Sequence, residues 1–317
     1  MPLNPSSGEP LTAAAAALTA SATELPAGPV DAASLPPPRL TRARAPLVQS
    51  VLAVDETGRP TEVSVPAERA LTVYLDRREL VTLMTLGAEP ELLVLGYLRN
   101  QRLVRSVQEI ESVTVDWEVG AAAVRTRHGV ADIEARTAQR VVTTGCGQGS
   151  VFGGLMDDLD RIELAPATLS QAELYGLVNA IRLQESTYKS AGSVHGCALF
   201  RGAEMLVFVE DVGRHNAIDT IAGWMWMQPQ AVRGDDKVFY TTGRLTSEMV
   251  IKSAQMGVPI VVSRSGITAM GLQVAQRLGL CAIGRALNRR FLCYSGAQRL
   301  LLQPGLAGPP GDAPSAA

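Results

Sequence analysis

The stretch VFYTTGRLTSEMVIKSAQMGVPIVVSRSGITAMGLQVAQRLGLCAIGR, residues 238–285, decides the fold class. Short apolar runs at 238–241, 260–262 and 280–283 alternate with longer amphipathic stretches at 247–256 and 268–278. Glycine or proline follows each amphipathic stretch, as is typical of helix ends. Strands that alternate with helices predict a mostly parallel sheet covered by helices.

The same alternation continues on both sides of this stretch. We expect a strand over 205–209 and a helix over 214–226 before it, and a further strand over 291–294 after it. Before residue 130 the pattern changes. Short β-prone runs at 63–65, 71–75, 113–117 and 121–125 are interrupted by one predicted helix, 89–99. The chain therefore divides into a β-rich domain with one helix over 45–135 and an α/β domain over 136–303.

Both ends of the chain have a different composition. Residues 1–44 are rich in Ala, Pro, Ser and Thr, and residues 304–317 are similar. Such segments bury too little apolar surface to offset the entropy of ordering them, so we expect two disordered tails.

The bulk composition excludes several classes of protein. A formal net charge of -2 argues against a nucleic-acid binder, which usually carries a basic excess. No apolar run approaches the length that crosses a bilayer, and the N-terminus lacks the basic start of a secretory signal. Four cysteines in 317 residues, without a CxxC pair, do not indicate a disulfide scaffold or a zinc site. We expect a cytoplasmic protein without zinc.

Arginines follow the ends of several predicted strands. Arg214, Arg244, Arg264 and Arg285 come after the strands that end near residues 209, 241, 262 and 283, and Arg289 and Arg290 lie close behind. The carboxyl ends of such strands are the usual ligand-binding edge, and guanidinium groups and helix N-termini suit phosphates. An anionic, phosphorylated ligand would fit this edge. The alternative is that each arginine caps a helix or pairs with a carboxylate on the surface.

Cys146 differs from the other cysteines in its surroundings. It lies in TTGCGQGS, residues 143–150, where glycines allow a tight loop and an accessible thiol. Cys197, Cys281 and Cys293 lie in apolar, strand-like runs, for which core packing is the better interpretation. His215 follows Arg214 at a predicted helix start and could act on a ligand, although a lone histidine is more often structural.

These motifs resemble those of one known family. The segment EDVGRHNAID, residues 210–219, is very close to the EDVGRHNAxDK signature of the FdhD family of formate dehydrogenase accessory sulfurtransferases. Further resemblances to that family follow at 192–195, 242–250, 260–268 and in the helix at 91–99. The similarity runs from residue 48 to residue 302 and leaves out only the tails.

The resemblance implies a fold, a role and site residues. It implies a cytidine-deaminase-like α/β domain of parallel or mixed sheet without zinc chemistry, beside a smaller β-rich N-terminal domain. Family members move sulfur from a cysteine desulfurase to the molybdenum bis(molybdopterin guanine dinucleotide) cofactor of formate dehydrogenase, and a homodimer is expected. By position, Cys146 matches the persulfide carrier, and the loop matched to the cofactor comprises Arg285, Ala286, Leu287, Asn288, Arg289 and Arg290.

One departure from the family pattern affects the mechanism. The second cysteine of the family's TGCGxCG loop is Gly149 here, so a mechanism that needs a disulfide within the loop is in doubt, whereas a relay through one cysteine is not. The competing hypothesis is a cofactor-binding chaperone that has lost sulfur transfer. A deaminase-like hydrolase is a third and weaker hypothesis, because the sequence lacks the HxE and PCxxC elements of a zinc site.

Overall fold

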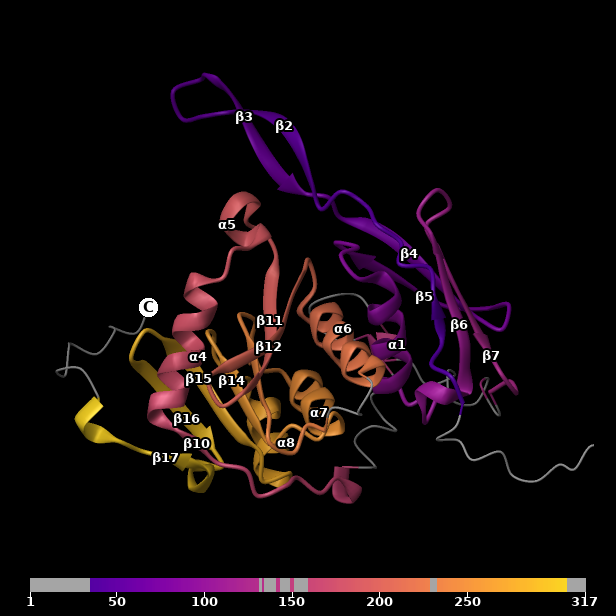
Figure 1. Cartoon of the computed structure of the whole chain (residues 1–317). Coiled ribbons are helices and arrows are strands. Elements are labelled where there is room, and N and C mark those ends of the chain that lie inside the picture. Colours follow the sequence, from indigo (N-terminus) through magenta and orange to yellow (C-terminus); the bar gives the residue numbers. More distant parts are fainter. Residues whose placement is uncertain are drawn as a thin grey trace, which may run out of the picture. The chain divides into compact units, whose positions relative to one another are not determined.

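The larger sheet of the protein forms the centre of the α/β part. We describe it from a computed structural model that covers residues 35–130, 133, 141–142, 149–150, 159–228 and 233–306. Six strands, most of them labelled in Figure 1, lie in the order β12-β11-β13-β14-β15-β16. Their bounds are β11 (His195–Arg201), β12 (Glu204–Asp211), β13 (Val238–Thr241), β14 (Ile260–Ser263), β15 (Cys281–Leu287) and β16 (Arg290–Ser295).

This sheet is mixed, with a parallel centre. β13, β14 and β15 pair in parallel, whereas β11 is antiparallel to both of its neighbours and β16 is antiparallel to β15. Because β11 is antiparallel to both β12 and β13, these two strands run in the same direction. The strands β12, β13, β14 and β15 therefore end at one edge of the sheet, where β11 begins.

Helices cover both faces because successive strand residues point to opposite sides. Leu199, Phe239 and Val261 pack under α6 (Arg214–Met227), α7 (Ser247–Gln255) and α8 (Ala269–Arg277). Phe200, Tyr240 and Val262 pack on the other face with α4 (Gln171–Leu183), which is followed by the short α5 (Thr187–Ala191). The α/β layering predicted from residues 238–285 is confirmed.

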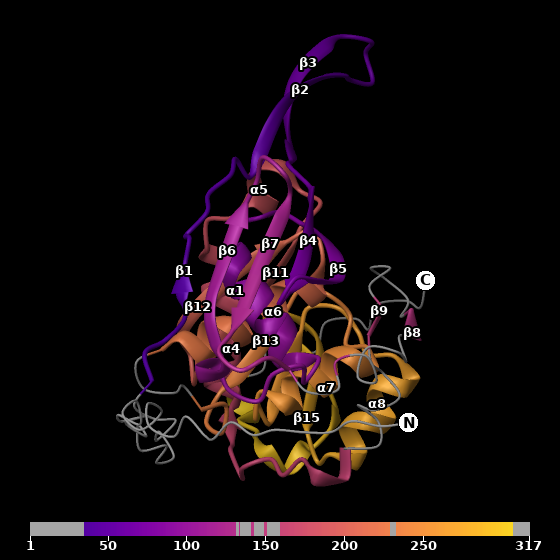
Figure 2. The ribbon, with the colours of Figure 1, turned by 90° about the vertical axis from the view of Figure 1, so that its right-hand side faces the viewer.

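A five-stranded sheet is built from the N-terminal part, in the order β1-β6-β7-β4-β5 (Figure 2). The helix α1 (Pro90–Asn100) packs on it through Leu93, Val94 and Leu98. The strands are β1 (Arg39–Leu40), β4 (Arg69–Leu75), β5 (Arg78–Thr85), β6 (Ile110–Asp116) and β7 (Ala121–Thr126). Because β1 pairs with β6, regular structure begins before residue 45, within the range expected to be a tail.

Three smaller pairs of strands complete the fold. The hairpin β2 (Val48–Val54) and β3 (Pro60–Pro66) forms a two-stranded sheet of its own. β8 (Val141–Val142) pairs with β9 (Gly149–Ser150), and β10 (Leu169–Ser170) pairs with β17 (Leu300–Leu301). All these elements lie in the unit that begins at Pro36. None of the helices that the structure describes is long and apolar enough to cross a membrane.

The helices α1 and α6 cross at a pair of glycines. A Cβ atom on Gly96 would lie 1.6 Å from the Asp219 carbonyl oxygen, and one on Gly223 would lie 2.0 Å from the Leu92 carbonyl oxygen. Only glycine leaves room for backbones this close. The crossing joins the N-terminal sheet to the α/β part and fixes the position of α6, whose first residues follow the end of β12.

Candidate functional site

The loops that follow β12, β13 and β14 meet the middle of β15 at one edge of the larger sheet. The Arg264 N–H donates to the Thr241 carbonyl at 3.0 Å, and the Arg285 N–H donates to the Ser265 carbonyl at 2.6 Å. On the other side, the Thr242 N–H donates to the Gly196 carbonyl at 2.9 Å. Segments that are far apart in the sequence thus form one continuous surface, as expected from the strand ends.

The arginines of this edge differ in exposure. Arg244, Arg264 and Arg285 are exposed, whereas Arg214, the first residue of α6, is only 4 % exposed. A Cβ atom on Gly243 would lie 2.7 Å from Arg214 Cδ, so the glycine after β13 leaves the space in which the Arg214 side chain lies. Three arginines of this edge are therefore exposed and one is buried.

His195 and the N-terminus of α7 also belong to this edge. Burial, together with the positive charges of Arg214 and Arg244, lowers the pKa of His195, so its ring is neutral at neutral pH. Its Nδ1 atom lies 3.4 Å from Thr242 Oγ1. Thr246 Oγ1, at the start of α7, is buried without a hydrogen-bond partner among the described residues. The sequence patterns alone do not single out Thr242 or Thr246. Their position directly after the predicted strand 238–241 is the signal that could have indicated them.

The segment 285–290, expected to be a loop, is mostly strand. Residues 285–287 belong to β15 and Arg290 opens β16, so only Asn288 and Arg289 form the turn. Ala286 is 1 % exposed and packs in the core, whereas the other five side chains are exposed. β15 continues past the end of β14, and this β-hairpin therefore extends beyond the ligand-binding edge.

A shallow cavity lies between this β-hairpin and α4. It has a volume of about 380 Å³ and is lined in part by Arg289, Asn288, Arg182 and Tyr175. The Tyr175 hydroxyl donates to the Arg289 carbonyl at 3.0 Å and holds the turn against the helix. Two guanidinium groups and polar amides make the cavity suitable for an anionic group.

Cys146 lies in 143–148, outside the residues that the structure describes. The neighbouring strands β8 and β9 pair antiparallel, with Val142 opposite Gly149.

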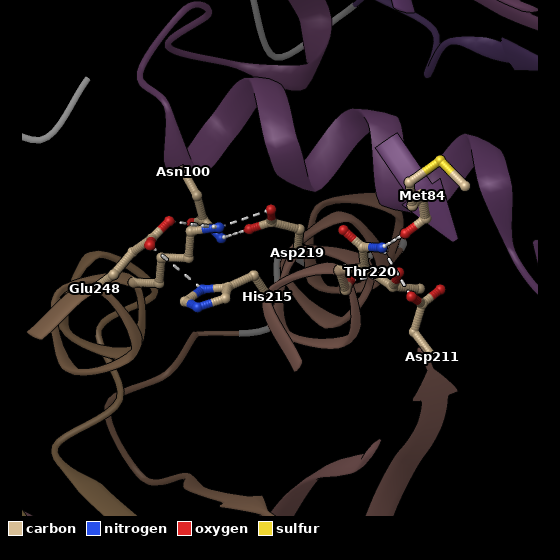
Figure 3. Close-up of polar contacts among 9 residues, drawn as sticks. Met84, Asn100, Asp211, His215, Asp219, Thr220 and Glu248 are labelled. Atoms are coloured by element: carbon tan, nitrogen blue, oxygen red, sulfur yellow. Dashed lines mark hydrogen bonds and ion pairs between the residues drawn. The ribbon is translucent and has the colours of Figure 1, made fainter. Parts of the chain in front are cut away.

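His215 lies at one end of a chain of buried polar side chains (Figure 3). Its Nδ1 atom is 3.6 Å from Glu248 Oε2, and Glu248 Oε1 is 3.6 Å from Lys252 Nζ. Lys252 Nζ is 2.8 Å from Asp219 Oδ2, and Asn100 Nδ2 donates to Asp219 Oδ1 at 2.7 Å. These side chains link α1, α6 and α7.

Burial sets the protonation state of His215, whereas charge pairing sets that of Lys252. Burial lowers the pKa of His215 to about 3, although the neighbouring Glu248 acts in the opposite direction. Burial also opposes the charged form of Lys252, but Asp219 and Glu248 together raise its pKa. At neutral pH we therefore expect a neutral His215 beside a charged Lys252.

The two aspartates of the segment 210–219 have structural roles. Asp211 accepts hydrogen bonds from the Gly213 N–H and Asn216 Nδ2 beside it, and from the Leu86 N–H and Thr85 Oγ1 at the end of β5. Asp211 therefore joins the start of α6 to the end of β5, and Asp219 forms an ion pair with Lys252.

Comparison with known proteins places these features in one family. The pattern of the FdhD/NarQ family matches residues 66–301. The chain is 32 % identical over 238 residues to the sulfur carrier protein FdhD of Bacillus subtilis, covering 74 % of this chain and 88 % of that protein. It is 30 % identical over 243 residues to the protein of the same name from Listeria innocua, covering 75 % of this chain and 92 % of that protein.

A solved structure agrees with this assignment. The crystal structure of a Desulfotalea psychrophila protein, described as a formate dehydrogenase accessory protein, superposes with a TM-score of 0.65 at 25 % identity. The match covers 81 % of this chain and all of that one. The chain belongs to the FdhD/NarQ family, as the segment 210–219 indicates.

Proposed function

We propose that this chain is a sulfurtransferase that carries a persulfide on Cys146. The observation that supports this most directly is the similarity to sulfur carrier proteins over most of both chains, which includes the loop that contains Cys146. The Cys146 thiolate would attack the outer sulfur of a persulfide on a cysteine desulfurase. A new S–S bond forms on Cys146, the donor's S–S bond breaks, and the donor leaves as a thiolate.

The acceptor in this proposal is the molybdenum bis(guanine dinucleotide) cofactor of a formate dehydrogenase, carried as cargo. The exposed Arg244, Arg264 and Arg285 support this choice, because guanidinium groups bind diphosphates through paired hydrogen bonds. The N-termini of α7 and α8 begin at the same edge and also favour anions. Arg289 in the cavity beside α4 would hold a further part of such an elongated ligand.

The carrier is tested by Cys146→Ser with Cys197→Ser as the matched control. In cells that lack the normal protein, we expect Cys146→Ser to abolish formate dehydrogenase activity and Cys197→Ser to retain it. Binding of GDP, as a fragment of the cofactor, should be unchanged in both variants. If Cys146→Ser supports full activity, the relay is wrong and the chaperone hypothesis replaces it.

The ligand edge is tested by calorimetry with GDP. Arg285→Ala and Arg289→Ala should each weaken binding by about 1.5–3 kcal/mol, the contribution of a hydrogen bond to a charged group. Affinity should fall with added salt, which screens exposed charges. Arg277→Ala is the control, because Arg277 lies at the opposite end of α8 and pairs with Asp160. Unchanged affinity in both edge variants would place the nucleotide elsewhere.

A further inference from the structure

The structure holds a second group of thiols, away from the loop of Cys146. Cys281 and Cys293 lie on the neighbouring antiparallel strands β15 and β16, and their Sγ atoms are 4.0 Å apart. The strands shift register beside them, because Ala282 pairs with Ser295 while Ile283 pairs with Cys293. The two sulfur atoms are thus in contact across the strands without being bonded.

The two thiols differ in access. Cys281 is fully buried under the core that includes Ile283 and Leu177, whereas Cys293 is only partly buried. β16 is the last strand of the sheet, and the Cys293 side chain on it is partly exposed. An accessible thiol with a second thiol directly behind it is the arrangement of an attacking and a resolving cysteine.

Electrostatics favour the same division of roles. A hydrogen bond from the Cys281 thiol lowers the pKa of Cys293 to about 7, while that bond and burial raise the pKa of Cys281. Near neutral pH a substantial fraction of Cys293 is the reactive thiolate, and Cys281 keeps its proton until it attacks.

We propose that Cys293 is a second persulfide-forming thiol and that Cys281 resolves its persulfide. The thiolate of Cys293 attacks the outer sulfur of a persulfide donor; a Cys293–sulfur bond forms, the donor's S–S bond breaks, and the donor leaves as a thiolate. Cys281 then attacks Cys293 Sγ and loses its proton. A Cys281–Cys293 disulfide forms, and the outer sulfur leaves as hydrosulfide. The two cysteines are oxidised and the transferred sulfur is reduced.

This pair would supply what the chain lacks in its loop, where Gly149 stands in place of a second cysteine. It also lies on the two strands that carry Arg285 and Arg290. The proposal rests on the proposed function only for the supply of a persulfide.

The test uses the full chain with Cys146→Ser, treated with glutathione persulfide and analysed by mass spectrometry. We expect the peptide of Cys293 to gain one sulfur atom, then a Cys281–Cys293 disulfide to form with release of sulfide. Adding Cys281→Ser should leave the persulfide in place and stop sulfide release. Cys197, whose pKa burial raises to about 12, is the internal control and should stay unmodified.

A second measurement is independent of the donor. At pH 7 iodoacetamide should modify Cys293 at least about a hundredfold faster than Cys197, because the thiolate fractions differ by more than that. The proposal is wrong if folded Cys146→Ser protein gains no sulfur on Cys293 and releases no sulfide. Failure of the Cys146 relay is distinguishable, because wild-type protein would then form the Cys281–Cys293 disulfide and release sulfide while Cys146 carries no sulfur.

Discussion

Lys252 is the residue whose loss should affect stability most among the polar side chains of α7. It is 1 % exposed and lies between Asp219, which is fully buried, and Glu248. Lys252→Met would leave two buried carboxylates without their cation, and breaking a buried pair costs about 3–5 kcal/mol. Urea denaturation measures this loss in the free energy of unfolding.

The matched control is Lys189→Met. Lys189 also follows a glutamate by four residues, but both side chains of that pair are exposed. An exposed pair of this kind contributes about 0.5 kcal/mol or less. Equal losses in the two variants would show that Lys252 is not held in a buried ion pair.

His215 should make stability depend on pH. Its pKa is about 3 in the folded protein and about 6.5 when unfolded. Because the folded pKa is lowered, the stabilisation is complete above pH 6.5 and is lost as the pH falls towards 3. Between pH 7 and pH 5 the free energy of unfolding should fall by about 2 kcal/mol more in the wild type than in His215→Gln. Parallel pH profiles in urea denaturation would contradict a neutral, buried His215.

The crossing of α1 and α6 is the element contact that should tolerate substitution least. Gly96→Ala places a methyl group within 1.6 Å of a backbone oxygen, so the two helices must separate. Overpacking usually costs about 1–3 kcal/mol, and a clash with backbone belongs at or above the upper end. Thermal unfolding should show a large drop in Tm.

Gly266→Ala serves as the control for this crossing. A Cβ atom on Gly266 would meet nothing within 4 Å, and this variant should change Tm little. Without a clash, alanine favours a helix over glycine by about 1 kcal/mol. An unchanged or higher Tm in Gly96→Ala would therefore show that the two helices are not in close contact.

The strands and helices after residue 205 were predictable because each has a strong local pattern. The predicted helix 247–256 and strand 238–241 agree with α7 and β13 to within a residue. The helix α4 was missed, although Ser170 and Glu173 form a capping box at its start. The antiparallel pairing of β11 with β13 could not be predicted, because it joins residues that are 38 to 44 positions apart in the sequence.

The candidate site was predictable only where backbone geometry follows from strand order. The meeting of the loops with Arg244, Arg264 and Arg285 follows from parallel strands, and the structure brings them together. The contact of Arg214 with Gly243 and the burial of Ala286 depend on packing that no local pattern contains. The contact between Cys281 and Cys293 depends on a register shift between β15 and β16.

At the scale of the whole molecule, the described part from Pro36 onward should unfold in one transition. Hydrogen bonds join the N-terminal sheet and α1 to α6 and β12, notably Asn100 to Asp219, Arg99 to the Ala222 carbonyl, and Asn216 to the Met84 carbonyl. These contacts are buried or partly buried, so neither part keeps its core when the other unfolds.

Two probes report on different regions of this unit. Far-UV circular dichroism follows all helices, whereas tryptophan fluorescence follows Trp117, which packs on the N-terminal core, and Trp224 and Trp226 of α6. In urea the two curves should coincide in midpoint and slope. Leu52→Ser, on the exposed face of the β2–β3 hairpin outside all three core clusters, should leave both curves unchanged. Gly96→Ala should shift both midpoints together; separate midpoints in the wild type would show that the two sheets unfold independently.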